Sequence, residues 1–320
     1  MIVLCGDPIK GNYIFNEDAD CCKGVMNINN EKTCCCSASN CCSTDSITSY
    51  DKNNKWIKGV IHTSKGDVPV VSTNLNFKDM LGAWKVRWGI ERMNYKINPG
   101  LYAIGNPVHT SPVLVSANYK LTFDVLRKEL SGMDCWILVL DTKGINVWCA
   151  AGKGTFGTDE LVSRIYKTGL TEIVSHRKLV LPQLGATGVS AHEVTKQTGF
   201  SVVYGSVRAK DIKAFLDSGF KATEEMRTVK FTLRDRLVLT PVELVNAAKS
   251  SLIIFGIMFL MNLFAARPFG LSDFIAYTGA VITGTVITPL LLPVIPGRAF
   301  AWKGWLMGLL WTLIFIWHNG

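Results

Sequence analysis

The hydrophobic pattern is clearest in the middle of the chain. Cys135–Leu140 is an uninterrupted apolar run, typical of a strand that is covered on both faces of a sheet. Shorter apolar runs lie on either side of it, and the segments between them carry apolar residues at helical spacing. Strands that alternate with helices predict a layered α/β domain.

The same alternation assigns the individual elements. The expected strands are Lys55–Ile61, Val68–Val71, Ser111–Val115, Cys135–Leu140, Ile145–Cys149, Lys178–Leu181 and Ser201–Val207. The expected helices are Phe77–Trp88, Thr122–Leu130, Thr158–Lys167, Ser190–Gln197 and Ala209–Asp217. Thr122 and Thr158 are the expected amino-terminal caps of two helices, and Gly89 and Gly169 end two. Thr228–Leu239 alternates and is expected to form an edge strand.

The two ends of the chain differ from its middle. Residues 1–55 are rich in Asn, Ser, Asp and Cys and show no sustained apolar period, which predicts a flexible, cysteine-rich tail. The other end is strongly apolar. We therefore expect a tail over residues 1–55, an α/β domain over residues 56–240 and a transmembrane domain over residues 241–320.

Three uncharged windows occupy the apolar end. They lie between Lys249 and Arg267, between Asp273 and Arg298, and after Lys303. Each holds about seventeen residues or more, near the length that crosses ~30 Å of hydrocarbon. A buried soluble helix explains any one window, but three in succession with a tryptophan-rich end predict about three spanning helices. We expect the second span to kink or end at Pro289, Pro293 and Pro296, and the membrane part to continue beyond Gly320.

The formal net charge of +9 raises the question of nucleic-acid binding. No block of Lys and Arg with interleaved aromatic residues is present, so nucleic acid is not an expected partner. The basic residues collect instead around the uncharged windows, at Arg227, Lys230, Arg234, Arg236, Lys249, Arg298 and Lys303. The positive-inside rule therefore predicts a multi-pass protein of the cytoplasmic membrane, in contact with lipid, whose α/β domain faces the cytoplasm.

Eight of the ten cysteines lie within the first 42 residues. The amino terminus has no basic segment followed by an apolar run, so we expect no export and a reducing compartment. Cys34–Cys36 and Cys41–Cys42 lack the spacing of an iron–sulfur cluster. They are interpreted either as ligands for a soft metal such as Hg(II) or as an incidental thiol-rich terminus.

Cys149 is the candidate chemical centre. It stands at the end of a predicted strand, before the glycine-rich turn Gly152–Gly157, and ligands of open α/β sheets bind at that edge. A phosphate-binding loop is excluded by spacing, because Val147 replaces its first glycine and Gly154 its Ser or Thr. A dinucleotide site is the other phosphate-binding alternative, and we do not expect it, although Glu172 lies twenty residues after Gly152. Local chemistry alone leaves a small core residue as the more ordinary role of a lone cysteine.

The wider motif changes that interpretation. Asn146–Thr158, with the sequence NVWCAAGKGTFGT, resembles the cap-helix region of corrinoid proteins related to the corrinoid/iron–sulfur protein of acetyl-CoA synthesis. The stretches Pro99–Pro107 and Ser111–Lys120 look like the same family. A cysteine at position 149 followed by a membrane tail resembles the HgcA family, the membrane-anchored corrinoid proteins of mercury methylation. The resemblance covers roughly residues 85–320, and its cysteine motif is highly specific.

The resemblance implies a Rossmann-like layered corrinoid-binding domain followed by an α-helical transmembrane domain. The implied cofactor is a corrinoid, cobalamin or a related cobamide, with its own base displaced. The Cys149 thiolate is then the lower axial ligand of cobalt, and Cys149 is both the catalytic and the metal-ligating residue. The implied cofactor-binding residues are Asn146, Val147, Trp148, Cys149, Ala150, Ala151, Gly152, Lys153, Gly154, Thr155 and Phe156.

Several neighbours of Cys149 have two interpretations. Trp148 and Phe156 either pack near the macrocycle or belong to the protein core, and Asn146 and Lys153 either orient the turn or meet corrin amides and phosphate. Thr155 and Thr158 are expected to cap a helix. None of the five histidines falls in the Asp-x-His-x-x-Gly pattern of histidine-ligated corrinoid proteins. His176 and His192 are expected near the ligand edge as surface or hydrogen-bonded residues.

The activity implied is corrinoid-dependent methyl transfer from methyl-cobalt(III) to inorganic Hg(II), which gives methylmercury. A soft thiolate donates strongly to cobalt and weakens the bond trans to it. The implied partners are Hg(II), a methyl donor system such as methyltetrahydrofolate, and HgcB, a ferredoxin-like protein with two [4Fe–4S] clusters that supplies electrons. Two alternatives stay open: a methyl-carrier corrinoid protein of one-carbon or acetyl-CoA metabolism with a non-mercury acceptor, and a membrane protein that stores or moves cobalamin.

Overall fold

A computed structural model describes residues 48, 54–264 and 270–319. The tail expected over residues 1–55 lies almost wholly outside the described residues. Thr48 is an exception: its buried hydroxyl donates to the carbonyl oxygen of Leu101 at 2.8 Å and accepts from the backbone nitrogen of Leu101 at 2.9 Å. This part of the chain therefore contacts the sheet at one point.

The described residues contain a seven-stranded sheet with the order β1-β2-β3-β5-β4-β6-β7. The strands are β1 (Ile57–Thr63), β2 (Gly66–Val71), β3 (Gly100–Ile104), β4 (Val113–Ala117), β5 (Cys135–Leu140), β6 (Lys178–Leu181) and β7 (Ser201–Tyr204). β4 to β7 run parallel to one another, whereas β1 is antiparallel to β2 and β3 is antiparallel to β5. The expected layered α/β architecture is thus present as a mixed sheet. Parallel strands separated by helices occur in β4–β7 and also in β2 and β3, which pair parallel with α1 between them in the chain.

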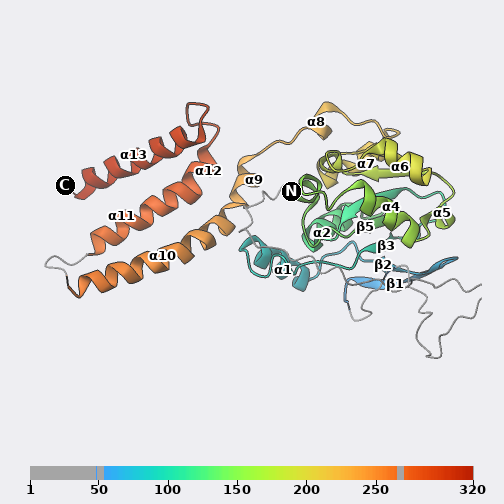
Figure 1. Ribbon diagram of the computed structural model, residues 1–320, viewed down its shortest axis with the longest axis horizontal. Coiled ribbons are helices and arrows are strands. Elements are labelled where there is room, and N and C mark those ends of the chain that lie inside the picture. Colours follow the sequence, from blue (N-terminus) through green and yellow to red (C-terminus); the bar gives the residue numbers. More distant parts are fainter. Residues whose placement is uncertain (1–47, 49–53, 265–269, 320) are drawn as a thin grey trace, which may run out of the picture.

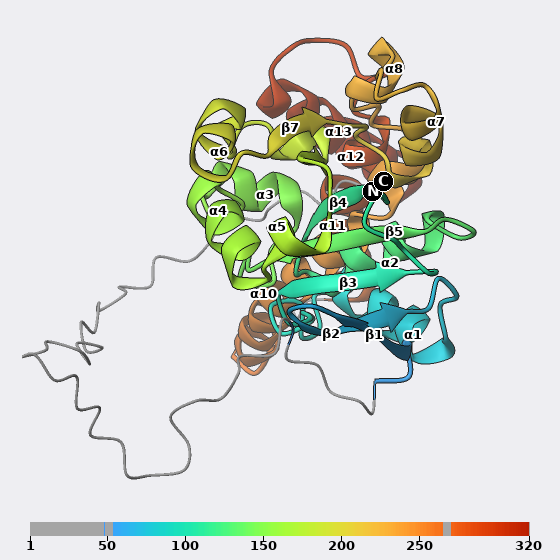
Figure 2. The ribbon, with the colours of Figure 1, turned by 90° about the vertical axis from the view of Figure 1, so that its right-hand side faces the viewer.

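Helices cover both faces of this sheet (Figures 1 and 2). The helices before the apolar end are α1 (Phe77–Arg87), α2 (Lys120–Glu129), α3 (Val147–Gly152), α4 (Thr158–Lys167), α5 (Leu170–Ile173), α6 (Ala191–Thr198), α7 (Ile212–Asp217), α8 (Glu224–Arg227) and α9 (Leu233–Leu237). Two short 3-10 turns are η1 (Gln183–Gly185) and η2 (Ala209–Asp211). Side chains of α3 to α6 pack in one hydrophobic core, and those of α2 and α7 pack in the other.

β5 shows how the sequence produces these two layers. All six of its side chains are buried, and successive side chains of a strand point to opposite faces. Trp136, Leu138 and Leu140 therefore enter the core under α3 to α6, while Cys135, Ile137 and Val139 enter the core under α2 and α7. A strand buried on both faces needs a continuous apolar run, and its bounds match the prediction.

Two further predicted elements have the observed bounds, the strand Lys178–Leu181 and the helix Thr158–Lys167. Two predicted strands are wrong. Ile145–Cys149 is expected to be a strand, but the chain turns into α3 at Val147, because the Asn146 side chain caps a helix there. Thr228–Leu239 contains α9 instead of an edge strand, because Thr232 and Asp235 form a capping box at its start.

The two predicted threonine caps are also wrong. α2 begins at Lys120 with Tyr119 as its cap, two residues before Thr122. α4 is capped by Gly157, so that Thr158 is already the first helical residue. β3 has no counterpart among the expected strands. It holds five buried residues, too few for a reliable period, and Gly100 and Ala103 weaken its apolar signal.

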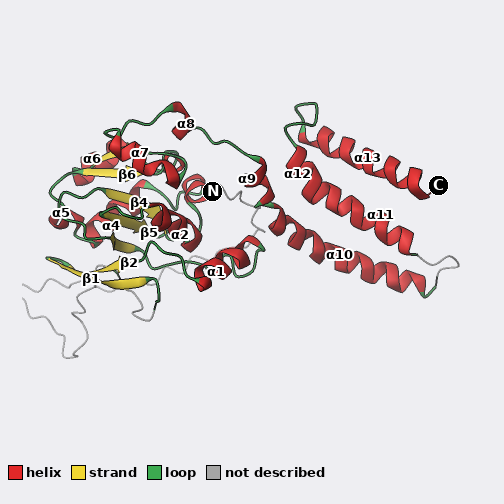
Figure 3. Ribbon diagram, turned by 180° about the vertical axis from the view of Figure 1, so that it is seen from behind, coloured by secondary structure: helices red, strands yellow, loops and turns green. Residues whose placement is uncertain are grey.

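The apolar end forms α10 (Thr240–Asn262), α11 (Leu271–Ile282), the π-helical turn η3 (Thr283–Ile287), α12 (Thr288–Leu291) and α13 (Phe300–Asn319). Figures 1 and 3 show α10, α11 and α13 side by side. The Ser251 and Tyr277 hydroxyls lie 3.0 Å apart, and Trp311 Nε1 donates to the Ala276 carbonyl at 3.0 Å. Leu233–Asn262, Leu271–Leu291 and Phe300–Asn319 are long and apolar enough to cross a membrane.

Candidate functional site

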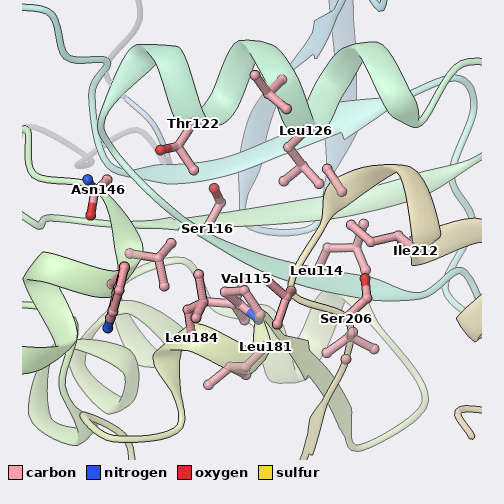
Figure 4. A pocket seen from close by; sticks show the side chains of 18 of the residues that line it. Leu114, Val115, Ser116, Thr122, Leu126, Asn146, Leu181, Leu184, Ser206 and Ile212 are labelled. Carbon is pink, nitrogen blue, oxygen red and sulfur yellow. The ribbon is translucent and has the colours of Figure 1, made fainter. Parts of the chain in front are cut away.

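A pocket opens at the carboxyl edge of the parallel strands, where open α/β sheets bind ligands (Figure 4). It holds about 930 Å³ of space between the atoms, including the part that is open to solvent. Its walls come from the ends of β4, β6 and β7, from one face of α2, from the start of α3, and from η1, η2 and α7. The lining residues are Leu114, Val115, Ser116, Tyr119, Leu121, Thr122, Val125, Leu126, Asn146, Val147, Trp148, Val180, Leu181, Pro182, Leu184, Gly205, Ser206, Val207, Ala209 and Ile212.

No charged side chain is among these lining residues. Polar groups are few and separated, at Ser116, Thr122, Asn146 and Ser206, among others (Figure 4). Taking an isolated anion such as a phosphate out of water into such a pocket is costly, because no cation would pair with it. The pocket therefore suits a neutral, largely apolar group that meets a few hydrogen-bonding groups at its edges.

α3 carries the first residues of the predicted site into the pocket wall. Asn146 Oδ1 accepts a hydrogen bond from the backbone nitrogen of Cys149 at 2.9 Å, which caps the helix. Asn146, Val147 and Trp148 line the pocket, whereas Cys149 does not. Cys149 is the next residue, in the first turn of α3, and is half-buried. The prediction that it ends a strand is wrong, but the prediction that it lies at the carboxyl edge of the sheet agrees with its position after β5.

The loop between β5 and α3 is held by Asn118, which follows β4 and is buried. Asn118 Oδ1 accepts from the Thr142 backbone nitrogen at 3.1 Å, from the Thr142 hydroxyl at 2.8 Å and from the Gly144 backbone nitrogen at 2.9 Å. Asn118 Nδ2 donates to Asp141 Oδ1 at 3.1 Å. This amide therefore holds the loop that leads from β5 into α3. Sequence reasoning assigned it no role, although an Asn at the end of a buried apolar strand was a usable signal.

Two carboxylates strengthen the same loop. Burial alone would raise the pKa of Asp141, but hydrogen bonds from Lys143 and Asn118 and the charge of Lys143 hold that pKa below its ordinary value. Glu160, in the first turn of α4, accepts from the Asp141 backbone nitrogen at 2.8 Å and pairs with Arg164 at 2.7 Å. The end of β5 is thus tied both to the loop that precedes α3 and to α4.

The glycine-rich turn after α3 divides into an exposed and a buried part. Gly152, Lys153 and Gly154 are exposed, and Gly154 has a φ of +78° that favours glycine. Phe156 is fully buried in the core beneath α3. A Cβ at Gly188 would lie 2.2 Å from the Phe156 carbonyl oxygen, so the loop after η1 packs directly on this turn.

The remaining residues of the motif pack against, or hydrogen-bond to, other parts of the protein. Ala150 and Ala151 are buried in the same core as Phe156. Thr155 Oγ1 donates weakly to the Ala150 carbonyl at 3.4 Å, and Thr158 Oγ1 accepts from the Ser190 backbone nitrogen at 2.9 Å. Of the two interpretations for Phe156, its complete burial supports core packing. Trp148 is half-buried and reaches the pocket, so its position supports contact with a ligand.

Trp148 also connects the site to the segment that leads to the apolar helices. Its ring centroid lies 6.3 Å from that of Phe231, which precedes α9. Arg208 pairs with Asp235 of α9 at 2.7 Å, and Arg208 follows the pocket residues Ser206 and Val207. The segment before α10 therefore packs against the pocket rim at two points.

The histidines take no part in this site. His176 Nε2 lies 2.8 Å from the Ser111 carbonyl oxygen, before β4 and β6, which places it at the amino edge of the sheet and not at the expected ligand edge. His192 lies exposed on α6. Within the part of the chain that the structure describes, no group of three or more His, Cys, Asp or Glu side chains is arranged to hold a metal ion.

Residues 80–216 match the family described as CO dehydrogenase/acetyl-CoA synthase delta subunit. The chain is also similar to proteins named acetyl-CoA decarbonylase/synthase complex subunit gamma. The relative from Methanopyrus kandleri is 35% identical over 124 residues, which cover 38% of this chain and 26% of that protein. The relative from Methanocaldococcus jannaschii is 34% identical over 122 residues, 38% of this chain and 25% of that protein.

A third relative, from Archaeoglobus fulgidus, is 33% identical over 135 residues, which cover 42% of this chain and 28% of that protein. The chain thus spans about a quarter of the length of the curated relatives that it matches. The family match over residues 80–216 contains the pocket walls and α3, and it ends before the three apolar helices begin.

Proposed function

We propose that this chain is a membrane-anchored corrinoid protein that carries methyl groups, with the Cys149 thiolate as the protein's ligand to cobalt. The observation that carries the proposal is the position of Cys149, half-buried in the first turn of α3 beside a neutral pocket at the ligand edge of the sheet. The match to CO dehydrogenase/acetyl-CoA synthase delta subunit, over residues that contain this edge, supports the same chemistry.

The residues present fit a corrinoid. Its ring is largely apolar with amides around the rim, and the pocket offers an apolar wall with the polar groups of Ser116, Asn146 and Ser206. Its phosphate would stay outside the pocket, because no lining residue is basic. When bound, the corrinoid supplies the cobalt on which a methyl group is carried, and a soft thiolate suits that metal.

The chain's own residues position the turn that carries Cys149 and exclude water. Asn146 holds the first turn of α3 through the Cys149 backbone nitrogen, and Asn118 holds the loop before it. Val147 and Trp148 present apolar surface to the pocket, which keeps water from the side of α3 that faces it. Ala150, Ala151 and Phe156 anchor the helix in the core, while Gly152, Lys153, Gly154 and Thr155 form the turn that lets it pack closely.

We further propose that the three apolar helices place the chain in the cytoplasmic membrane, with the pocket in the cytoplasm. Support comes from their length and composition and from the basic residues at their proposed cytoplasmic ends. A protein with a methylated metal also needs a methyl donor, such as methyltetrahydrofolate, and a low-potential electron source. A ferredoxin-like protein with two [4Fe–4S] clusters, of the HgcB type, is the electron donor that we propose.

The methyl acceptor has two candidates. The relatives carry the name of an acetyl-CoA decarbonylase/synthase complex, which favours a protein-bound acceptor within such a complex. The cysteine motif together with the apolar helices favours inorganic Hg(II), a soft, thiophilic ion, and this is the acceptor that we propose.

The first test examines the cofactor and its ligand in the purified full chain, by optical and paramagnetic spectra after addition of cobalamin. We expect a thiolate-to-cobalt signature that Cys149→Ala abolishes. Cys135→Ala is the matched control, since Cys135 is fully buried in β5 and should leave the signature intact. An unchanged spectrum in Cys149→Ala would show that Cys149 is not the ligand of cobalt.

The second test separates the acceptors. The methylated full chain is offered Hg(II)–thiol complexes or an acetyl-CoA synthase, and the rate of methyl loss is measured for each. Faster loss to Hg(II), together with methylmercury as product, supports the mercury proposal. Faster loss to the synthase would favour the carrier of acetyl-CoA metabolism and would leave the assignment of Cys149 untouched.

A further inference from the structure

The outer face of α1 is apolar, although it faces away from both cores. Phe77, Met80, Leu81 and Trp84 recur at spacings of three and four residues, so they form one stripe along the helix. Their exposed fractions are 73%, 54%, 40% and 53%. Trp88, the residue after the helix, continues the stripe and lies 5.7 Å from Trp84 between ring centroids. A contiguous apolar stripe of this kind marks an interaction surface, unlike single exposed apolar residues.

The opposite face of α1 fixes the helix to the domain. Asp79 is buried and bonds with Lys120 at 2.7 Å and with Arg127 at 2.7 Å. The same Asp79 forms a capping box with Asn76, and Val86 packs in a small core with Tyr119. Because ion pairs and hydrogen bonds hold this face against the domain, the apolar stripe cannot turn inward without breaking them. The exposure of the stripe therefore follows from the way α1 packs on the domain.

Basic side chains border the stripe. Lys78 and Lys85 are exposed along one side of it, and Arg92 follows the helix. The acidic residues in this region are Glu91, which is exposed, Glu243, which is exposed and follows Val242 on α10, and Asp79, which is buried and paired. Apolar and tryptophan side chains flanked by lysines are the composition of a helix that lies in the interface of an anionic membrane.

α1 is also joined to the start of the first apolar helix. A Cβ at Gly89 would lie 3.5 Å from Val242 Cγ2, and Val86 and Arg87 line a small cavity together with Leu239 and Val242. Figures 1 and 3 show α1 at the end of the domain from which α10 leaves. Val242 precedes Lys249, where the uncharged stretch begins, by seven residues or about 10 Å of helix. That distance is slightly more than the roughly 5–8 Å that the headgroup layer adds on each side of the hydrocarbon.

From these observations we infer that α1 is an interfacial helix whose stripe of Phe77, Met80, Leu81, Trp84 and Trp88 binds an anionic lipid surface. This inference rests on the membrane anchoring proposed above. The stripe and the first apolar helix would together hold the domain at the membrane at two points. Two attachment points would restrict the rotation of the α/β domain and so fix the orientation of the pocket relative to the membrane.

The test uses the full chain in vesicles of phosphatidylcholine, with and without phosphatidylglycerol. A photo-reactive benzoylphenylalanine replaces Phe77 or Trp84, and Tyr166, an exposed aromatic residue of α4, is the control position. We expect several-fold more lipid adduct from positions 77 and 84 than from position 166. Lys78→Glu combined with Lys85→Glu should lower the adduct several-fold in the phosphatidylglycerol vesicles and much less in phosphatidylcholine alone.

A separate wash with alkaline carbonate distinguishes the two proposals. A chain that stays in the vesicles but gives no more lipid adduct at positions 77 and 84 than at position 166 overturns the role of α1. Adducts to a second copy of the chain, or to another protein, overturn it as well. A chain that carbonate releases overturns the membrane anchoring, whereas strong lipid adducts in that released chain would still support α1 as a lipid-binding surface.

Discussion

The two faces of α2 differ in what they contact: one face packs against α1 through ion pairs, and the other lines the pocket. One face carries Lys120, Asp124 and Arg127, which form an ion cluster with Asp79 of α1 at distances of 2.6 to 2.8 Å. The other face, with Leu121, Thr122, Val125 and Leu126, lines the pocket and presents no charge to it. Both faces arise from ten residues read at helical spacing.

We therefore assign the charged face of α2 to the stability of the fold and its pocket face to ligand binding. In the ion cluster two cations meet two carboxylates, and Arg127 also donates to the carbonyl oxygens of Ser72 and Asn74, so its buried groups are satisfied. Such a cluster is closed to a ligand. The pocket face leaves space that the protein does not fill, and a small number of polar side chains stand among its apolar lining residues.

The largest effect is expected from breaking the ion cluster. Arg127→Ala leaves two carboxylates with one cation in a buried site, which should cost about 3–5 kcal/mol of stability. For a domain of this size that is a fall in Tm of roughly 6–20 °C. The measurement is thermal unfolding of the full chain in detergent, with amide hydrogen exchange of α1 and α2. Lys65→Ala, which breaks the exposed pair with Glu172, is the control and should cost at most about 1 kcal/mol. Equal losses in both variants would contradict the distinction.

Acid should weaken the same cluster by a smaller amount, since the cations stay in place. Burial raises the pKa of Asp79, but hydrogen bonds and charge from Lys120, the Asn76 backbone and Arg127 together hold it below its ordinary value of 3.8. A depressed pKa contributes stability that is present above the ordinary value and is lost as the pH falls through the folded value. The stability difference between the protein and Asp79→Asn should therefore narrow on going from neutral pH to about pH 3. If the difference in stability between the two proteins did not change with pH, Asp79 would not contribute to the loss of stability in acid.

Filling the pocket should affect binding more than folding. Val125 is half-buried and lines the pocket, so Val125→Trp places a large ring in the space that we assign to the corrinoid. We expect cobalamin to bind at least about tenfold more weakly, a change of about 1.4 kcal/mol. Lys128→Trp, on the exposed side of the same helix, should bind cobalamin normally. Unchanged affinity in Val125→Trp would place the cofactor elsewhere.

The sequence predicted the centre of the fold better than its edges, for physical reasons. β5 is buried on both faces, so its composition alone defines it. α3 has six residues, and its start depends on one capping side chain, so an apolar run was mistaken for a strand. The edge strand expected over Thr228–Leu239 was wrong because capping at Thr232 outweighed its alternation. The ion cluster was not foreseen, since Asp79 and Arg127 are 48 residues apart and only the packing of α1 on α2 joins them.

The smallest effect is expected at the cap of α3, and it tests whether a pocket residue also serves stability. Asn146→Ala removes the 2.9 Å hydrogen bond to the Cys149 backbone nitrogen and should cost about 1 kcal/mol. Asn146→Asp keeps an acceptor and should lose much less stability. Because the same turn carries Cys149, we expect Asn146→Ala also to alter the thiolate-to-cobalt spectrum, while Asn146→Asp restores it. A loss of stability with an unchanged spectrum would show that Asn146 caps α3 but does not position Cys149. Binding of the cofactor at the pocket face of α2 would then not depend on this side chain.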